Sequence, residues 1–311
     1  MNKNKVLILG TGQAGGNIAE EMAGLGYETL AFNTANSDLD KLEKVVNKIV
    51  IGNTEGSGKN RNLSKDNFSK ERNKVREALQ SCFKNSKIEL VIIPFGAGGG
   101  TGSGSSLLLA DEVRSLGKKA WLAPIMYYEN EGNITKINSL SFVRDFEKVK
   151  DVYPCFIFNN TSDTQSINKY ISTAFDELIN EGGSCETVFD FRDLMNTVRA
   201  GYNYLGRGMG NQIKVHADIL DNSQSKYATL IKSNKVREDG YNILNTLNFG
   251  NVDRNYYQTI AEQEKWLLLL GGMYLNNEVV KELQSEAQKT ISEIKKKDEV
   301  VNLDLDTDGI F

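Results

Sequence analysis

The run Phe95-Gly-Ala-Gly-Gly-Gly-Thr-Gly-Ser-Gly104 places six glycines within nine residues. It follows the apolar stretch 90–94, which is typical of a buried strand, and precedes residues 105–116, which have the pattern of a helix. Glycines tolerate positive φ and leave room where Cβ atoms would otherwise stand. A strand, a loop with few side chains and a helix start together let backbone N–H groups close on an anion. The run therefore predicts a phosphate-binding loop.

The first half of the chain alternates short apolar runs with helical patterns, which predicts an α/β fold with a parallel sheet covered on both faces. The expected strands are 6–9, 29–32, 48–51, 90–94, 120–124 and 155–158, and the expected helices are 15–25, 66–83, 105–116 and 134–150. Right-handed crossovers bring the carboxyl ends of these strands to one edge, where ligands bind. The six polar or glycine-rich loops that follow the strands therefore predict one large nucleotide site.

A helix is expected over 164–181, since apolar residues recur there at helical spacing. From about residue 202 a second, smaller unit follows, with strands expected at 202–206 and 265–270 and a helix over 278–297. Residues 298–311 carry five acids and no base, which is typical of an extended tail.

Composition excludes several classes of function. The chain has 37 basic and 41 acidic residues, and this balance argues against general nucleic-acid binding. A single histidine makes His-based zinc sites and Ser-His-Asp hydrolysis poor candidates. Three widely spaced cysteines indicate a reducing compartment, and no apolar run approaches the roughly 20 residues of a membrane span, so a cytoplasmic location is expected.

The first loop, Gly10-x-Gly12-x-x-Gly15, matches the dinucleotide fingerprint by letter. That fingerprint also needs an acid at the end of the second strand to hold the ribose, and Asn33 stands there instead. The first loop is therefore expected to bind phosphate, but not the phosphate of NAD.

The third loop, residues 52–60, fails the P-loop pattern because Asn53 replaces the first glycine and Asn60 follows the lysine. It is still expected to wrap a terminal phosphate with the backbone amides of residues 56–58, while Lys59 adds positive charge.

These loops together carry a specific resemblance. Gly98-Gly-Gly-Thr-Gly-Ser-Gly104 resembles the signature loop of the tubulin/FtsZ superfamily of GTPases. Residues 12–17 and 33–34 are similar to that family's N-terminal elements, and residues 188–194 and 204–210 to its catalytic loop and the strand after it. The resemblance runs in order from residue 6 to about 210, and the short length and acidic tail are most similar to the TubZ and phage-tubulin branch.

The resemblance implies a Rossmann-like GTP-binding domain at 1–163, a central helix at 164–182, a catalytic loop and following helix at 183–200, a smaller α+β domain with a terminal helix at 201–297, and an acidic tail at 298–311. It implies GTP and GDP as ligands, with Mg2+ held mainly by their phosphates. The implied nucleotide-binding residues are Gly12, Gln13, Ala14, Gly15, Asn17, Asn33, Gly56, Ser57, Gly58, Lys59, Gly98, Gly99, Gly100, Thr101, Gly102, Ser103, Glu131, Asn159 and Asn168.

Two aspartates are the candidate catalytic residues. Asp190 and Asp193 are three apart, so at a helix start they face the same side, a spacing that also suits helix capping. The resemblance implies that they enter the phosphate site of the next subunit and position or polarise the attacking water. Hydrolysis would then need a head-to-tail contact, and a head-to-tail contact that does not close a ring grows a filament.

The expected function is therefore a GTP-dependent, filament-forming GTPase that assembles with itself, binds no nucleic acid or membrane directly, and segregates or positions plasmid or phage DNA. The tail is expected to bind a neighbouring subunit or an adaptor protein, or to serve only as a solubilising end. The alternatives are a cell-division polymer like FtsZ, an NAD(P)-binding oxidoreductase that uses only the first loop, and a GTP-binding adaptor that does not polymerise.

Overall fold

The apolar runs of the first half form one side of a single large sheet. The computed structural model describes residues 3–52, 55–84, 87–127, 131–161, 163–181, 191–210, 213, 219–221, 225–236, 239–247, 252–259 and 263–297. Within these residues the sheet has eleven strands: β1 Val6–Thr11, β2 Glu28–Asn33, β3 Asn47–Val50, β4 Leu90–Gly96, β5 Lys119–Ile125, β6 Pro154–Phe156, β7 Gly201–Met209, β8 Leu220–Asp221, β9 Tyr227–Ser233, β10 Asp253–Thr259 and β11 Lys265–Leu275.

The strand order is β10-β9-β11-β7-β6-β5-β4-β1-β2-β3, and β8 pairs with β11. Every pairing from β3 to β7 is parallel, whereas β11 runs antiparallel to β7, β8 and β9. The order reverses between β1 and β4, because the chain first winds outward to β3 and then returns to β4 on the other side of β1. Open α/β sheets bind ligands outside the carboxyl ends of the strands at such a reversal.

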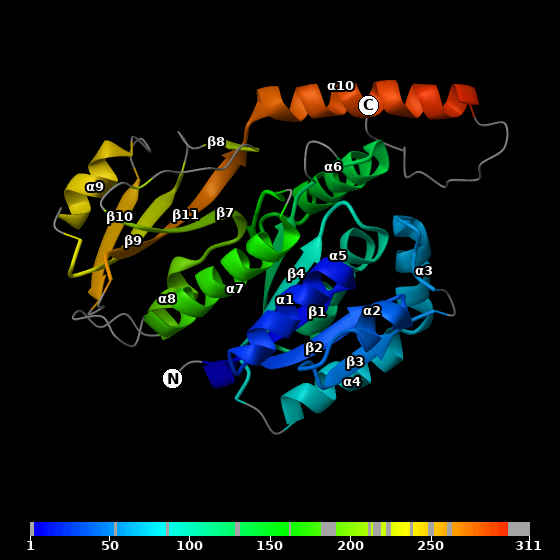
Figure 1. Ribbon diagram of the computed structural model, residues 1–311, viewed down its shortest axis with the longest axis horizontal. Coiled ribbons are helices and arrows are strands. Elements are labelled where there is room, and N and C mark those ends of the chain that lie inside the picture. The colour runs from blue at the N-terminus through cyan, green and yellow to red at the C-terminus, as the bar shows by residue number, and fades with distance from the viewer. Residues whose placement is uncertain are drawn as a thin grey trace.

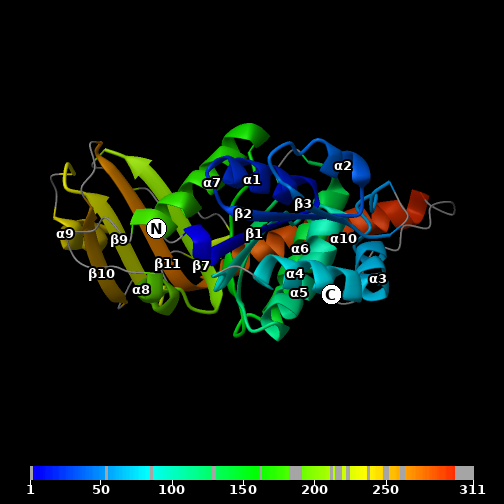
Figure 2. The ribbon, with the colours of Figure 1, turned by 90° about the horizontal axis from the view of Figure 1, so that it is seen from below.

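Helices cover both faces of the sheet (Figure 2), as the alternation of apolar runs predicts. Their bounds are α1 Gly12–Gly24, α2 Asn36–Asp40, α3 Arg61–Lys70, α4 Arg72–Lys84, α5 Gly100–Ser115, α6 Asn133–Glu147, α7 Thr164–Glu181, α8 Phe191–Thr197, α9 Gly240–Thr246 and α10 Asn277–Lys297, after a 3-10 turn at Lys3–Lys5. Within the described residues, none of these helices is both long and apolar enough to cross a membrane.

Two hydrophobic layers sandwich the sheet, and the strands alternate between them. In β1, Val6 and Ile8 join the layer formed with α1, α2, α7 and α8, whereas Leu7 and Leu9 join the layer formed with α3, α4, α5 and α6. This period of two is what an extended strand buried on both faces requires. The predicted α/β class with a large, mostly parallel sheet is confirmed.

Two predicted helices have wrong bounds. The helix expected at 105–116 begins five residues earlier, so Gly100 to Gly104 form its first turn and not a loop. The helix expected at 66–83 is two helices, α3 and α4, which break at Glu71. The side chain of Glu71 turns back to accept the Gly52 N–H at 2.6 Å, which lowers the pKa of this carboxyl.

The terminal helix α10 does not pack only within the second unit. It crosses α6 (Figure 1), and its buried residues Ala287 and Ile291 join the layer that covers the first half of the sheet. Lys136 of α6 pairs with Glu286 of α10 at 3.0 Å.

The aromatic cluster around α7 offers a test of this packing. Phe175 is 1% exposed and its ring lies 5.5 Å from Phe156 and 5.8 Å from Phe158. We expect Phe175→Ala to lower the free energy of unfolding by about 3–5 kcal/mol, because it leaves a cavity between α7 and the sheet. Chemical denaturation measures this loss.

The matched control is Val46→Ala, since Val46 is 86% exposed and should change stability by less than about 0.5 kcal/mol. Equal stabilities for the two variants would contradict the assignment of Phe175 to the core.

Candidate nucleotide site

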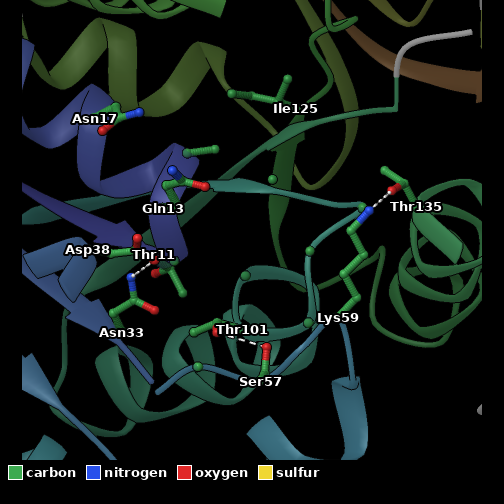
Figure 3. Close-up of a pocket in the computed structure, with 18 of the residues that line it drawn as sticks. Thr11, Gln13, Asn17, Asn33, Asp38, Ser57, Lys59, Thr101, Ile125 and Thr135 are labelled. Atoms are coloured by element: carbon green, nitrogen blue, oxygen red, sulfur yellow. Dashed lines mark hydrogen bonds between the residues drawn. The ribbon is translucent and has the colours of Figure 1, made fainter. Parts of the chain in front are cut away.

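A cavity of about 510 Å³ opens where the strand order reverses, outside the carboxyl ends of β1 and β4. Figure 3 shows its polar walls. Gly12, Gly100 and Thr164, the first residues of α1, α5 and α7, all line it, and Thr135 in the first turn of α6 lines it as well.

The helix starts at this cavity are suited to an anion. In the described residues, neither Thr11 before α1 nor Gly99 before α5 caps its helix with a side-chain hydrogen bond. The N–H groups of a first helical turn have no partner within the helix, and the helix dipole adds partial positive charge there. Two such helix ends that face one cavity form a strong phosphate-binding arrangement.

None of the six glycines of the run 96–104 has a positive φ, and four of them, Gly98, Gly100, Gly102 and Gly104, are needed for space. A Cβ on Gly100 would lie 2.4 Å from Ser57 Oγ, and a Cβ on Gly102 would lie 2.8 Å from the Gly96 oxygen. The first turn of α5 therefore rests with its backbone directly against residues 57–60 on one side and β4 on the other.

Thr101 joins three segments at the floor of the cavity. Its Oγ1 lies 2.7 Å from Thr34 Oγ1, just after β2, and 3.2 Å from Ser57 Oγ in the third loop (Figure 3). All three hydroxyl groups belong to buried residues, so they hold the loops in a fixed arrangement around the start of α5.

Lys59 brings positive charge to the cavity. Its Nζ donates to Thr135 Oγ1 at 2.8 Å (Figure 3), and its backbone oxygen accepts from Asn138 Nδ2 at 2.8 Å. Lys59 is also the one non-glycine residue with positive φ in the described part of the chain, at 63°. Residues that carry a side chain rarely adopt this backbone conformation, and such backbone strain is common at binding sites.

Three carboxylates also line the cavity: Asp38, Glu55 and Glu131. Asn33 Nδ2 donates to Asp38 Oδ2 at 3.1 Å, so an acid does stand beside the end of β2 (Figure 3). The sequence has no acid directly at the end of β2, but Asp38 of the short helix α2 brings a carboxylate there. The described residues contain no cluster of three His, Cys, Asp or Glu side chains that could hold a metal ion.

The structure brings most of the predicted nucleotide-binding residues together. Those that line the cavity are Gly12, Gln13, Ala14, Asn17, Asn33, Gly56, Ser57, Gly58, Lys59, Gly98, Gly99, Gly100, Thr101, Gly102, Glu131 and Asn168. Gly15, Ser103 and Asn159 do not line it. Asp193 lies in the first turn of α8, away from the cavity, and Asp190 lies outside the described residues.

Of the three predicted residues that do not line the cavity, Gly15 and Ser103 make other contacts. Gly15 packs α1 onto the sheet, where a Cβ would lie 2.1 Å from the Pro94 oxygen. Ser103 turns away from the cavity, donates to the Gly99 oxygen and accepts from Arg61 Nε. Asn160 lines the cavity in place of Asn159, and its Nδ2 donates to Glu131 Oε1 at 3.2 Å.

Twelve further lining residues are not among the predicted nucleotide-binding residues, although several belong to the predicted loops. They are Thr11, Ala35, Ser37, Asp38, Glu55, Gly96, Ile125, Met126, Thr135, Asn160, Thr164 and Ile167. Position after a strand could have found Thr11, Gly96 and Met126, whereas Thr135 reaches the cavity only because α6 packs beside α5.

A match to a known family accompanies this geometry. Residues 5–168, more than half of the chain, match the GTPase domain of the tubulin/FtsZ family. The chain therefore belongs to the tubulin/FtsZ family, as the glycine run predicts.

Curated relatives match about half of the chain. The chain is 29% identical over 155 residues to the tubulin-like protein CetZ of Thermococcus kodakarensis and 28% identical over 151 residues to the cell division protein FtsZ of Mycoplasmopsis pulmonis. Each match covers 47% of this chain, but only 41% and 37% of the respective relatives. The chain thus spans about two fifths of the length of these relatives.

Solved structures show the same fold over nearly the whole chain. A tail-truncated TubZ from Clostridium botulinum phage c-st superposes with a TM-score of 0.79 at 17% identity, covering 94% of this chain and 100% of that one. CetZ2 from Haloferax volcanii, a GTPγS-bound protofilament, superposes with a TM-score of 0.78 at 20% identity, covering 94% and 99%. The predicted likeness to TubZ thus extends to the fold.

The close contact at Gly100 gives a test of the site. In Gly100→Ala the new methyl group should push residues 57–60 away from α5. We expect this displacement to weaken the binding of a fluorescent guanine nucleotide roughly 100-fold, as a displacement of about 1 Å does at a reacting centre.

The control is Gly16→Ala in the interior of α1, where the added Cβ would lie 3.4 Å from Leu42 in ordinary contact. It should leave nucleotide binding unchanged and stabilise the helix by about 0.5–1 kcal/mol. Unchanged affinity in Gly100→Ala would show that the contact between α5 and the third loop does not shape the binding site.

Proposed function

We propose that this protein is a GTPase that binds GTP in the cavity at the start of α1 and α5 and polymerises head to tail. The observation that carries the proposal is the pair of uncapped helix starts at one cavity, in a chain that belongs to the tubulin/FtsZ family. We assign GTP binding to residues 1–163, the central helix to 164–182, the catalytic loop with its helix to 183–200, and the second domain to 201–297.

The walls of the cavity are equipped to hold phosphate. Among the described lining residues there is no histidine or arginine. Backbone amides, Thr101 and Lys59 can position the phosphates and stabilise their charge. Magnesium prefers oxygen ligands, and the carboxylates of Asp38 and Glu55 would supply them beside the phosphates.

The length of α7 supports hydrolysis between subunits. Thr164 lines the cavity, and α7 then runs for 18 residues, or about 27 Å at 1.5 Å per residue, before the segment that leads to α8 (Figure 1). Asp193 at the start of α8 therefore belongs to the opposite end of the molecule from its own cavity. In a head-to-tail contact, Asp190 and Asp193 of one copy would meet the cavity of the next.

The finer parts of the proposal rest on likeness and composition. CetZ2 is described as a GTPγS-bound protofilament and the phage protein as a TubZ, which favours filaments in plasmid or phage DNA segregation. We place the protein in the cytoplasm on its cysteine usage, and assign the acidic residues 298–311 to binding a neighbouring subunit or an adaptor protein.

Sedimentation and electron microscopy with GTP, GDP, ATP and a slowly hydrolysed GTP analogue test the proposal. We expect filaments with GTP and with the analogue, and no filaments with GDP or with ATP. GTP binding without filaments would favour a non-polymerising adaptor, and saturable binding of NAD(P) in place of GTP would favour an oxidoreductase.

The catalytic proposal predicts a specific phenotype for Asp190→Ala. We expect it to keep GTP binding and assembly, to lose hydrolysis and to form over-stable filaments, because the acid acts on the neighbour's nucleotide. Phosphate release and pelleting measure this. Asp253→Ala, which removes an exposed acid on β10, is the control and should behave as the wild type. Normal turnover in Asp190→Ala would refute the role.

A further inference from the structure

Arg61 is a buried cation directly behind the cavity. It is the first residue of α3, immediately after the third loop, and its side chain is 2% exposed. A buried guanidinium must be paired and hydrogen-bonded, since its transfer from water is costly. It does not line the cavity, and the proposed catalysis assigns it no role.

The Arg61 guanidinium bonds to the first turn of α5. Its Nε donates to Ser103 Oγ at 3.1 Å, and its Nη2 donates to the Ser103 backbone oxygen at 3.2 Å. Ser103 Oγ in turn donates to the oxygen of Gly99, the residue before the helix start. Arg61 thereby fixes the turn whose free N–H groups face the cavity.

The same guanidinium also bonds to α6. Arg61 Nη2 donates to Asp145 Oδ2 at 2.8 Å, and Lys65 reaches the same oxygen at 3.3 Å. Burial alone would raise the pKa of the Asp145 carboxyl, but Arg61 and Lys65 outweigh it and hold this pKa below its usual range. Asp145 is therefore charged at neutral pH and pairs with Arg61.

These contacts occur where α3 and α5 touch with almost no side chain between them. A Cβ on Gly104 would lie 2.6 Å from the Arg61 oxygen, and Ser64 Oγ lies 2.6 Å from Ser105 Oγ. A small shift of α3 along α5 therefore moves residues 57–59, which lie just before α3 in the chain and line the cavity.

We propose that Arg61 is a positioning residue for the terminal phosphate: by bonding Ser103 and Asp145 together, it sets the third loop and the start of α5 at the spacing that distinguishes GTP from GDP. This inference rests on the proposed function. The β-phosphate needs only the starts of α1 and α5, whereas the γ-phosphate also needs residues 56–59 in register with Thr101. Loss of the Arg61 contacts should therefore weaken GTP binding more than GDP binding.

The test compares the affinities of the full chain for GTPγS and GDP by calorimetry. In Arg61→Met the GTPγS affinity should fall on the order of tenfold, less than the roughly 100-fold expected of a 1 Å displacement at a reacting group, with GDP affinity nearly unchanged. Arg61→Lys, which keeps the charge but not the forked geometry, should restore only part of the difference.

A second variant guards against a failure to fold. Ser103→Ala keeps the Arg61–Asp145 pair and removes one hydroxyl group, so it should fold and still lower the ratio of GTPγS to GDP affinity. The matched control is Arg72→Met, which breaks an ion pair of 2.7 Å between α4 and Glu112 in the last turn of α5. It should lower the thermal midpoint without changing the affinity ratio.

The outcomes distinguish a failure of the positioning role of Arg61 from a failure of the proposed function. An unchanged ratio in both Arg61→Met and Ser103→Ala, with a wild type that binds both nucleotides, overturns the positioning role and leaves the proposed function intact. Equal losses for GTPγS and GDP also overturn it, since a purely structural role affects both alike. A wild type that binds neither nucleotide overturns the proposed function itself.

Discussion

The approach of α5 to its neighbours without intervening side chains is the constraint on which the site depends. At Gly100, Gly102 and Gly104 the helix backbone contacts the third loop, β4 and α3 at distances that leave no room for a Cβ. Because bare backbones touch, the uncapped N–H groups of the first turn lie beside the loop residues that complete the cavity. A single methyl group on this helix would separate the two walls.

The same architecture places Asp193, one of the two proposed catalytic acids, away from the cavity. The reversal of strand order puts the cavity at the carboxyl ends of β1 and β4, and α7 runs from that cavity toward α8 (Figure 1). If the catalytic acids act on the nucleotide of the next copy, as we propose, the site becomes complete only when two copies meet head to tail. Assembly and hydrolysis would then be linked by geometry, with no separate signal between them.

The sequence predicted most of the fold and much of the site because both depend on local patterns. Strands buried on both faces are continuous apolar runs, and each loop after them falls at the same edge. It failed where packing between distant elements decided the outcome. Asp38 reaches the end of β2 through a one-turn helix, Thr135 reaches the cavity through α6, and Gly15 serves the contact with Pro94 instead of a ligand.

By itself, the sequence determined that a glycine-rich phosphate loop follows a buried strand in an α/β protein of the tubulin/FtsZ family, since composition and spacing carry that information. Only the tertiary structure decided why the glycines are there. None of those in the run adopts a positive φ; Gly100, Gly102 and Gly104 instead admit neighbouring backbones, and this role is visible only once those neighbours are in place. The bonds from Arg61 to Ser103 and Asp145 are likewise visible only in the tertiary structure, because they join residues 42 and 84 positions apart.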